Sequence, residues 1–401
     1  MCHINKSRKD EICFMKYLPT IILLFLILCL SSCKLARFAY YNVSEIDDYK
    51  IFNTRQINKD SISYEFKKSK LEFPIQNFYF SFDGGKKESK TLLEILKETK
   101  TVGFLIIKKD SILFEKHLYD YTRESLVNSF STAKSILSTL VGSAIDDGYI
   151  NSVKDPITRY IPELEKNGFQ EVTIENLLQM TSGIKFWENY YIPYADAGNF
   201  YYGRNLEKEV SKLKLKYKPG TKYHYSSGDS QLLGLVLKNA LKNKTISKYL
   251  EEKLWIPLGM EYNASWSLDD KGFEKTFCCI NATAIDYAKI GRLYLNKGNW
   301  NGKQIVPEKW IEQTTKIDTL NGSLKDYQYN WYLNSDKSFY TIGYKGQHIY
   351  IDPDNELVIV RLGKIQGKIK VGNKRGNFGW NNFFKIISRK FKEESTGYNK
   401  A

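Results

Sequence analysis

The sequence predicts an α+β fold, in which an antiparallel sheet is built from both ends of the chain around an inserted, mainly helical region. Strand patterns occur early, at 101–108 and 112–119, and return late, at 348–351 and 357–362. Between them, over about 150–325, apolar residues recur at helical spacing and Gly/Pro loops interrupt the runs. Strands from the two termini are therefore expected to share one sheet, with helices flanking it.

The early elements are a hairpin followed by a helix. Thr101–Lys108 and Ile112–Tyr119 are rich in β-branched and aromatic residues, and a polar turn at 109–111 joins them. From Ser131 the apolar residues repeat at helical spacing, and this pattern ends at Gly148.

The late elements are two strands and an amphipathic helix. His348–Ile351 and Leu357–Leu362 flank an Asp-Pro-Asp-Asn turn. The helix is predicted from an apolar stripe at spacings of three and four, formed by Trp380, Phe383, Phe384, Ile387 and Phe391.

Residues 1–32 are expected to be an export signal. The unbroken apolar run Ile21–Leu30 follows basic residues and is shorter than the roughly 20 residues of a membrane span. Leu30-Ser31-Ser32-Cys33 resembles a bacterial lipobox, which implies lipidation at Cys33 and attachment to a membrane of the bacterial cell envelope, at the outer membrane or periplasmic face. A plain secretory signal and a membrane anchor are the alternatives. Residues 33–70 are interpreted as a tether and an N-terminal extension.

Lys and Arg outnumber Asp and Glu by 60 to 45, which gives a net charge of +15. Such an excess suggests nucleic acid, a membrane surface or an acidic polymer as partner, and export argues against nucleic acid. Positions 361–392 hold ten basic residues and no acids: 361, 364, 368, 370, 374, 375, 385, 389, 390 and 392. We expect their outward face to meet an anionic envelope surface, or to be an ordinary solvated face.

Two cysteines follow each other at Cys278 and Cys279, and we expect two buried thiols there rather than a strained bond. The sequence contains no P-loop, GxGxxG or HExxH motif, and its histidines are scattered. No metal and no cofactor is therefore expected.

The first chemical signal is Ser131-Thr132-Ala133-Lys134, an S-x-x-K at the start of the predicted helix. The spacing places both functional side chains on one helix face. A Ser hydroxyl needs a neighbouring base, and Lys can serve if burial lowers its pKa. The tetrapeptide alone is weak evidence, because it also fits a helix start with an exposed Lys.

Three further segments strengthen this signal: VTIENLLQMTSGI at 172–184, KPGTKYHYSSGDSQLLG at 218–234 and GYKGQHIYIDP at 343–353. With VNSFSTAKSIL around Ser131, their order and spacing resemble the β-lactamase-related serine hydrolases. This family includes class C β-lactamases, DD-peptidases, esterases and 6-aminohexanoate (nylon-oligomer) hydrolases. The resemblance implies a β-lactamase/transpeptidase-like fold, assigned to residues 71–396.

The resemblance also implies catalytic roles. Ser131 would be the acylated nucleophile, Lys134 would take or relay its proton, and Tyr225 would act with Lys134 toward the leaving group. The oxyanion hole would be formed by the backbone N–H groups of Ser131 and Gln347.

Departures from the family pattern bear on the substrate. The second motif ends in Ser227 rather than Asn, and the third is Tyr344-Lys345-Gly346 rather than Lys-Thr-Gly. In the family pattern, the first residue of the third motif is a Lys that helps hold a substrate carboxylate. Here the Lys is displaced by one position to Lys345, and on a strand its side chain would point to the opposite face of the sheet. The Tyr-x-Ser motif resembles the esterase and nylon-oligomer branch.

The loop at 186–202 is unusually aromatic, and Trp187, Tyr190 and Tyr191 are candidate substrate contacts, or simply packed side chains. We therefore expect an exported serine hydrolase that cleaves a small-molecule or peptide-like ester or amide. The alternatives are a cell-wall DD-peptidase or penicillin-binding protein, a weak class C-like β-lactamase, and a non-catalytic binding or sensor protein on the same fold.

Overall fold

The computed structural model describes residues 17–23, 25, 38–41, 43–70, 77–81, 87–192 and 194–397. Its main sheet has eight strands in the order β12-β13-β14-β15-β16-β5-β6-β2. Their bounds are β2 Lys67–Lys68, β5 Thr101–Lys108, β6 Ser111–His117, β12 Tyr327–Gln328, β13 Trp331–Leu333, β14 Phe339–Tyr340, β15 His348–Asp352 and β16 Leu357–Gly363. Pairing is antiparallel except between β2 and β6. Strands from both ends of the chain thus meet in one sheet, as the sequence predicts.

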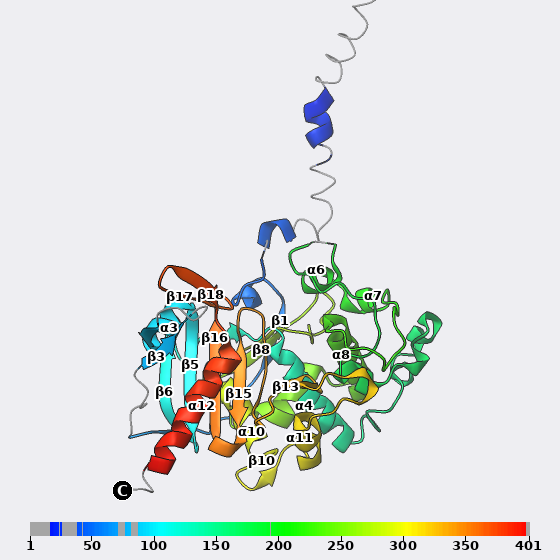
Figure 1. The fold of residues 1–401 in the computed structure, drawn as a ribbon. Coiled ribbons are helices and arrows are strands. Elements are labelled where there is room, and N and C mark those ends of the chain that lie inside the picture. Colours follow the sequence, from blue (N-terminus) through cyan, green and yellow to red (C-terminus); the bar gives the residue numbers. More distant parts are fainter. Residues whose placement is uncertain are drawn as a thin grey trace, which may run out of the picture.

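Helices cover both faces of this sheet (Figure 1). Helices α3 (Leu92–Glu98) and α12 (Trp380–Gly397) lie on one face, and α10 (Ala284–Leu295) packs on β16, β15 and β5 from the other, where α4 (Thr132–Asp146) joins the same core. Alternate side chains of β16 enter the two cores, so the strand is buried throughout and apolar except at Arg361.

The inserted region is mainly helical, as predicted. It contains α5 Ile174–Leu178, α6 Asp196–Tyr201, α7 Leu206–Val210, α8 Ser227–Leu241, α9 Ile246–Leu250, α11 Glu308–Thr315 and a π-helical turn η5 Glu251–Trp255. Within the described residues, the 3₁₀ turns are η1 Asp48–Lys50, η2 Ile157–Arg159, η3 Pro162–Asn167, η4 Phe169–Glu171, η6 Leu320–Gly322 and η7 Pro353–Asn355.

A second sheet crosses the insertion, and the sequence patterns did not indicate it. It joins β1 (Thr54–Ile57), β8 (Ala264–Ser267), β9 (Ile280–Ala282) and β7 (Val127–Asn128). Three two-stranded hairpins complete the fold: β3 Asn77–Phe80 with β4 Glu88–Thr91, β10 Asn299–Trp300 with β11 Lys303–Gln304, and β17 Lys368–Val371 with β18 Lys374–Asn377. Through β1, the N-terminal extension is part of the packed body, and its Ile46 and Ile57 are buried.

The local predictions for the hairpin at 101–119, for helix α4 and for the terminal helix are confirmed. One prediction about charge is wrong: Arg361 does not belong to the outward basic face, because its side chain is completely buried. Cys33 and most of the expected signal lie outside the described residues. Among the described helices, none combines the length and hydropathy that a membrane crossing requires.

Candidate active site

Ser131 stands at the N-cap of α4 but does not cap the helix. Other N-cap residues of this chain, such as Thr173 and Ser226, accept hydrogen bonds from their own helices. Phe130, directly before Ser131, has a φ of 45°, and its N–H donates to Oδ1 of Asn128 at 2.9 Å. This left-handed turn is costly for a bulky side chain and is typical of functional sites. It leaves the Ser131 hydroxyl available for chemistry.

Lys134 lies one helical turn further on, and its ammonium reaches back to the Ser131 Oγ at 3.0 Å. The side chain is 1% exposed, and Nζ also donates to the Phe277 carbonyl at 2.7 Å and to the Ser227 Oγ at 3.3 Å. Burial lowers the pKa of Lys134 to about 8, although the charge of Glu188 raises it. About a tenth of Lys134 is therefore neutral at pH 7 and able to accept a proton.

Tyr225 completes the cluster from the loop that precedes α8. The Lys134 Nζ lies 5.2 Å from the centre of its ring. Burial raises the pKa of the Tyr225 hydroxyl well above its ordinary value, and a hydrogen bond to Ser131 opposes this only in part. Tyr225 is thus a neutral phenol in the free protein. Of the two groups, Lys134 is the better resting base, and Tyr225 is suited to relay or donate a proton.

Ser227 brings an unforeseen carboxylate into the site. Glu188 accepts hydrogen bonds from the Ser227 N–H at 2.7 Å and from the Ser227 hydroxyl at 2.6 Å, at the N-terminus of α8. The Tyr190 hydroxyl is 2.9 Å from the same Oγ. Ser227 and Tyr190 were predicted as substrate contacts from the sequence, whereas Glu188 was not. The signal for it was a single acid in the aromatic run Trp187-Glu188-Asn189-Tyr190.

The third motif forms a turn, and the expectation that it lies on a strand is wrong. Gly343 and Gln347 form an isolated bridge, Lys345 and Gly346 have φ angles of 63° and 81°, and β15 begins only at His348. Hydrogen bonds within the motif favour this compact turn, since the Gly343 N–H donates to the Gln347 carbonyl at 2.7 Å. The turn lies against α4, where the Thr132 hydroxyl donates to the Gln347 carbonyl at 3.3 Å. The Gln347 N–H in turn donates to the Gly343 carbonyl at 3.2 Å, so this N–H belongs to a turn that packs against α4.

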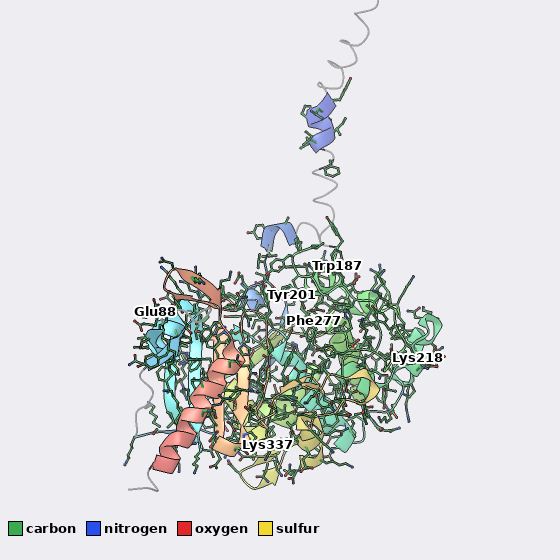
Figure 2. All side chains as sticks on the ribbon, viewed as in Figure 1. Glu88, Trp187, Tyr201, Lys218, Phe277 and Lys337 are labelled. Carbon is green, nitrogen blue, oxygen red and sulfur yellow. A yellow bond between two sulfur atoms is a disulfide. The ribbon has the colours of Figure 1, made fainter. Side chains whose placement is uncertain are left out.

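Neighbouring segments hold the other side chains of this turn. Lys345 forms an ion pair with Glu45 of the N-terminal extension, and the Tyr344 hydroxyl hydrogen-bonds that of Tyr191. Trp187 lies elsewhere: it borders a separate cleft of about 590 Å³. In Figure 2 Trp187 lies toward the edge of the body, whereas Phe277, which contacts Lys134, lies deeper. The structure thus brings Tyr190 to the cluster, Tyr191 to its third motif, and Trp187 to neither.

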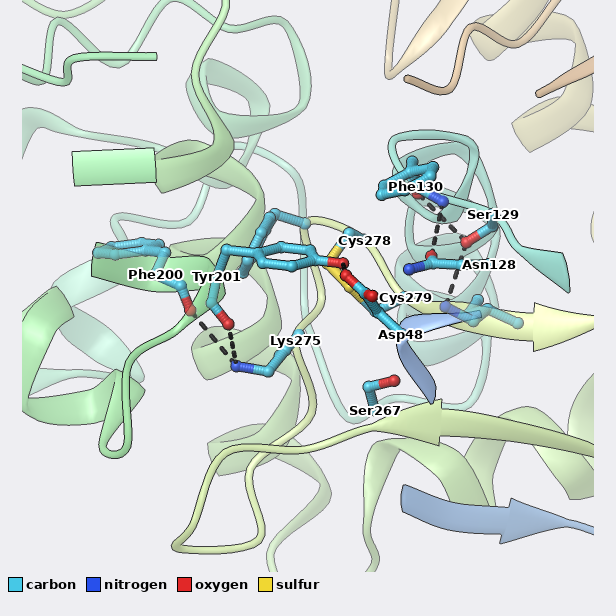
Figure 3. The surroundings of a disulfide bond; sticks show 12 residues. Asp48, Asn128, Ser129, Phe130, Phe200, Tyr201, Ser267, Lys275, Cys278 and Cys279 are labelled. Atoms are coloured by element: carbon cyan, nitrogen blue, oxygen red, sulfur yellow. Dashed lines mark hydrogen bonds between the residues drawn. A yellow bond between two sulfur atoms is a disulfide. The ribbon is translucent and has the colours of Figure 1, made fainter. Parts of the chain in front are cut away.

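Cys278 and Cys279 are joined in a disulfide, so the expectation of two free thiols is wrong (Figure 3). The expectation rested on the short Cα–Cα distance that a trans peptide sets between adjacent residues, which is 3.7 Å here, and the bond forms where Cys279 has a left-handed backbone with a φ of 76°. The pair directly follows Phe277, whose carbonyl binds Lys134. In the part of the chain that the structure describes, no group of His, Cys, Asp or Glu could hold a metal ion.

A model of the beta-lactamase family matches residues 93–377, which is more than half of the chain. The chain therefore belongs to this family of serine hydrolases, and the resemblance inferred from its motifs is confirmed.

Among curated proteins, the chain is similar to the 6-aminohexanoate-dimer hydrolase of Paenarthrobacter ureafaciens, with 24% identity over 67% of this chain and 73% of that protein. Among solved structures, it is similar to a Bacillus anthracis protein whose name assigns it to the 6-aminohexanoate-dimer hydrolases. The TM-score is 0.73 at 22% identity, and the match covers 90% of this chain and 95% of the other. A family VIII carboxylesterase matches with a TM-score of 0.56 at 17% identity, over 70% and 92% of the two chains. These structures share the fold.

Proposed function

We propose that this chain hydrolyses an ester or simple amide bond through an acyl-enzyme on Ser131. The observation that carries the proposal is the contact of 3.0 Å between the Ser131 Oγ and the Nζ of Lys134, a buried amine whose pKa is lowered to about 8. A hydroxyl becomes a useful nucleophile when such a base can take its proton. A non-catalytic binding protein would have no need for this arrangement.

In the proposed reaction, the Ser131 Oγ attacks the substrate carbonyl carbon while its proton passes to neutral Lys134. The carbonyl π electrons move to the oxygen, which the N–H groups of Ser131 and Gln347 stabilise. Collapse of this intermediate breaks the bond to the leaving group, which receives the proton from Lys134 through Tyr225. Water then attacks the acyl-enzyme, returns a proton through the same groups and releases the acid and free Ser131.

The charges around the cluster favour substrates without a carboxylate next to the scissile bond. The cation of the third motif, Lys345, is already paired with Glu45. A second carboxylate, Glu188, lies beside Ser227. A substrate anion would meet these acids, which disfavours β-lactams and D-Ala peptides. The names of the relatives, an aminohexanoate-dimer hydrolase and a carboxylesterase, agree with cleavage of a simple amide or ester.

The test compares the wild-type protein with Ser131→Ala on p-nitrophenyl esters, a cephalosporin reporter and the 6-aminohexanoate dimer. We expect turnover of an ester or of the dimer that Ser131→Ala abolishes, with little turnover of the cephalosporin. Covalent labelling by a fluorescent penicillin without turnover would instead favour a DD-peptidase. If no substrate is cleaved and no serine-reactive probe labels Ser131, the proposal is refuted.

We further propose that lipid on Cys33 tethers the enzyme to the cell envelope and that its basic surface faces anionic lipid. The support is the apolar run before Cys33, together with the β17–β18 hairpin, whose Lys368, Lys370 and Arg375 are exposed. In Figure 1 this hairpin and residues 38–41 lie toward the same end of the body. We expect Cys33→Ser to move the protein to the soluble fraction. Persistence in membranes would contradict lipidation.

A further inference from the structure

Arg361 is a fully buried cation that the reaction described above does not use. It lies on β16 and pairs in register with His348 of β15 and Phe104 of β5. Its guanidinium carbon lies 4.3 Å from the centre of the Trp380 ring, and the structure pairs it with no carboxylate among the residues it describes. Burying a charge without a counter-ion is unfavourable, and burial lowers the pKa of Arg361 to about 9. A neutral side chain would fill this position without that cost.

The hydrogen bonds of Arg361 converge on the third-motif turn. Its Nη1 donates to the carbonyls of Lys345 and Gly346, each at 2.7 Å, and to that of Ile365 at 3.1 Å. The other donors reach Thr99 and Thr101: Nη2 donates to the Thr99 carbonyl at 2.8 Å, and Nε to the Thr101 hydroxyl at 3.1 Å. The guanidinium therefore fixes the turn to strands β16 and β5.

Two glycines make room for this guanidinium. A Cβ on Gly346 would lie 2.1 Å from the Arg361 Nη1, and Gly346 also has a φ of 81°. A Cβ on Gly363 would lie 2.1 Å from both Cζ and Nη1. Gly363 itself has no left-handed backbone, so close approach to Arg361 is the constraint there.

The contact with Gly346 also has an electronic consequence. The Gly346 carbonyl and the Gln347 N–H belong to one peptide group, and this N–H is the second donor of the proposed oxyanion hole. In the free protein the same N–H donates to the Gly343 carbonyl at 3.2 Å, so an oxyanion would share or replace that bond. A cation that binds the carbonyl polarises the peptide and makes its N–H a stronger donor. The side-chain amide of Gln347 makes two hydrogen bonds with the backbone of Gly363. Its Nε2 donates to the Gly363 carbonyl at 2.8 Å, and its Oε1 accepts from the Gly363 N–H at 3.0 Å. The donor is thus oriented by two independent anchors.

We propose that Arg361 is a positioning residue of the oxyanion hole, which orients and polarises the Gly346–Gln347 peptide. This inference rests on the proposed hydrolase function. It assigns to Arg361 a role in stabilising the transition state rather than in binding the substrate.

The test measures steady-state kinetics on a p-nitrophenyl ester and affinity for a boronic acid, which forms a tetrahedral anion on Ser131. For Arg361→Met we expect kcat to fall on the order of 100-fold with KM nearly unchanged, since loss of an oxyanion donor has effects of this size. Boronate affinity should fall by a similar factor, because the boronate depends on the same donors. Arg361→Lys should recover part of both losses.

A second variant keeps the proposal testable if Arg361→Met does not fold. Gly363→Ala keeps the charge but displaces the guanidinium, so kcat and boronate affinity should fall together. Lys289→Met is the matched control: it removes another buried cation, which donates to the Gly259 carbonyl at 2.8 Å, and should lower thermal stability while leaving kcat unchanged.

The outcomes separate the two proposals. Wild-type kcat and boronate affinity in Gly363→Ala, or in a folded Arg361→Met, would overturn the role of Arg361 alone. A fall in kcat that Lys289→Met reproduces would also overturn it, because instability would then be the cause. A wild-type protein that neither turns over substrate nor binds the boronate would refute the hydrolase and this role together.

Discussion

Replacing Glu188 by Gln should move the pH dependence of catalysis to lower pH. Lys134 must be neutral to accept the Ser131 proton, so kcat/KM should fall as pH drops below its pKa of about 8. The charge of Glu188 favours the protonated ammonium and raises this pKa. Removing the charge while keeping the size of the side chain should therefore lower the pKa of Lys134.

The size of the shift follows from the contacts around Ser227. Its Oγ lies 2.6 Å from Glu188 and 3.3 Å from the Lys134 Nζ, so the two charges are at most about 6 Å apart. With an effective dielectric constant of about 20, Coulomb's law gives about 3 kcal/mol, or about 2 pKa units. Glu188 is only half-buried, and solvent screening reduces this to about 1 unit. The neutral fraction of Lys134 at pH 7 would then rise from about 10% to about 50%.

The assay is kcat/KM for a p-nitrophenyl ester between pH 6 and 9.5. The midpoint of the acid limb should move from about 8 in the wild type to about 7 in Glu188→Gln. Glu175→Gln is the matched control, because Glu175 is a buried acid that accepts from the Tyr329 hydroxyl and is not bonded to Ser227 or Lys134. The acid limb of the Glu175→Gln pH profile should stay where it is in the wild type. An unmoved or raised midpoint in Glu188→Gln would refute the electrostatic link between Glu188 and Lys134.

Three other substitutions test separate parts of the structure. Tyr225→Phe should lower kcat by about 100-fold or more with little change in Tm, because it removes a proton relay; activity within threefold of wild type would exclude that role. Glu45→Gln should release Lys345 and raise kcat/KM for an ester bearing a carboxylate by about fivefold, roughly 1 kcal/mol, relative to a neutral ester; an unchanged ratio would show that the pair does not affect selectivity. Phe384→Ala, at a completely buried position of α12, should lower the free energy of unfolding in urea by about 3–5 kcal/mol, and a loss below about 1 kcal/mol would contradict its place in the core.

The elements predicted from sequence are those with a local pattern. The hairpin, α4 and α12 each carry an alternation or an apolar stripe within a single segment, and each was found close to its expected bounds. The sheet β1-β8-β9-β7 was missed because its strands are two to four residues long and come from distant parts of the chain. Their pairing is fixed by tertiary contacts, such as Thr54–Ile57 against β8, that no local period records.

The residues of the candidate site show the same difference between local and distant signals. Ser131, Lys134 and Tyr225 were found because they stand in short motifs whose order resembles a known family. Glu188 is hydrogen-bonded to a residue 39 positions away, and Arg361 donates to carbonyls 15 and 16 positions before it. Such separations leave no spacing pattern in the sequence. Arg361 was accordingly counted with the exposed basic residues that follow it.

Lys134 and Arg361 together indicate how the proposed site stabilises the negative charge that develops during the reaction. Both cations are buried, both donate to backbone carbonyls, and neither forms an ion pair with a carboxylate among the described residues. Carbonyls satisfy the N–H donors of these cations without cancelling their net charge. In the proposed reaction, the transition state places a negative charge on an oxygen between the N–H groups of Ser131 and Gln347, and positive charge nearby stabilises it without reorganisation. In that reaction Lys134 becomes charged only as it takes the Ser131 proton, so its charge and that of Arg361 act together only when the oxyanion forms, which is the condition for faster catalysis rather than tighter substrate binding.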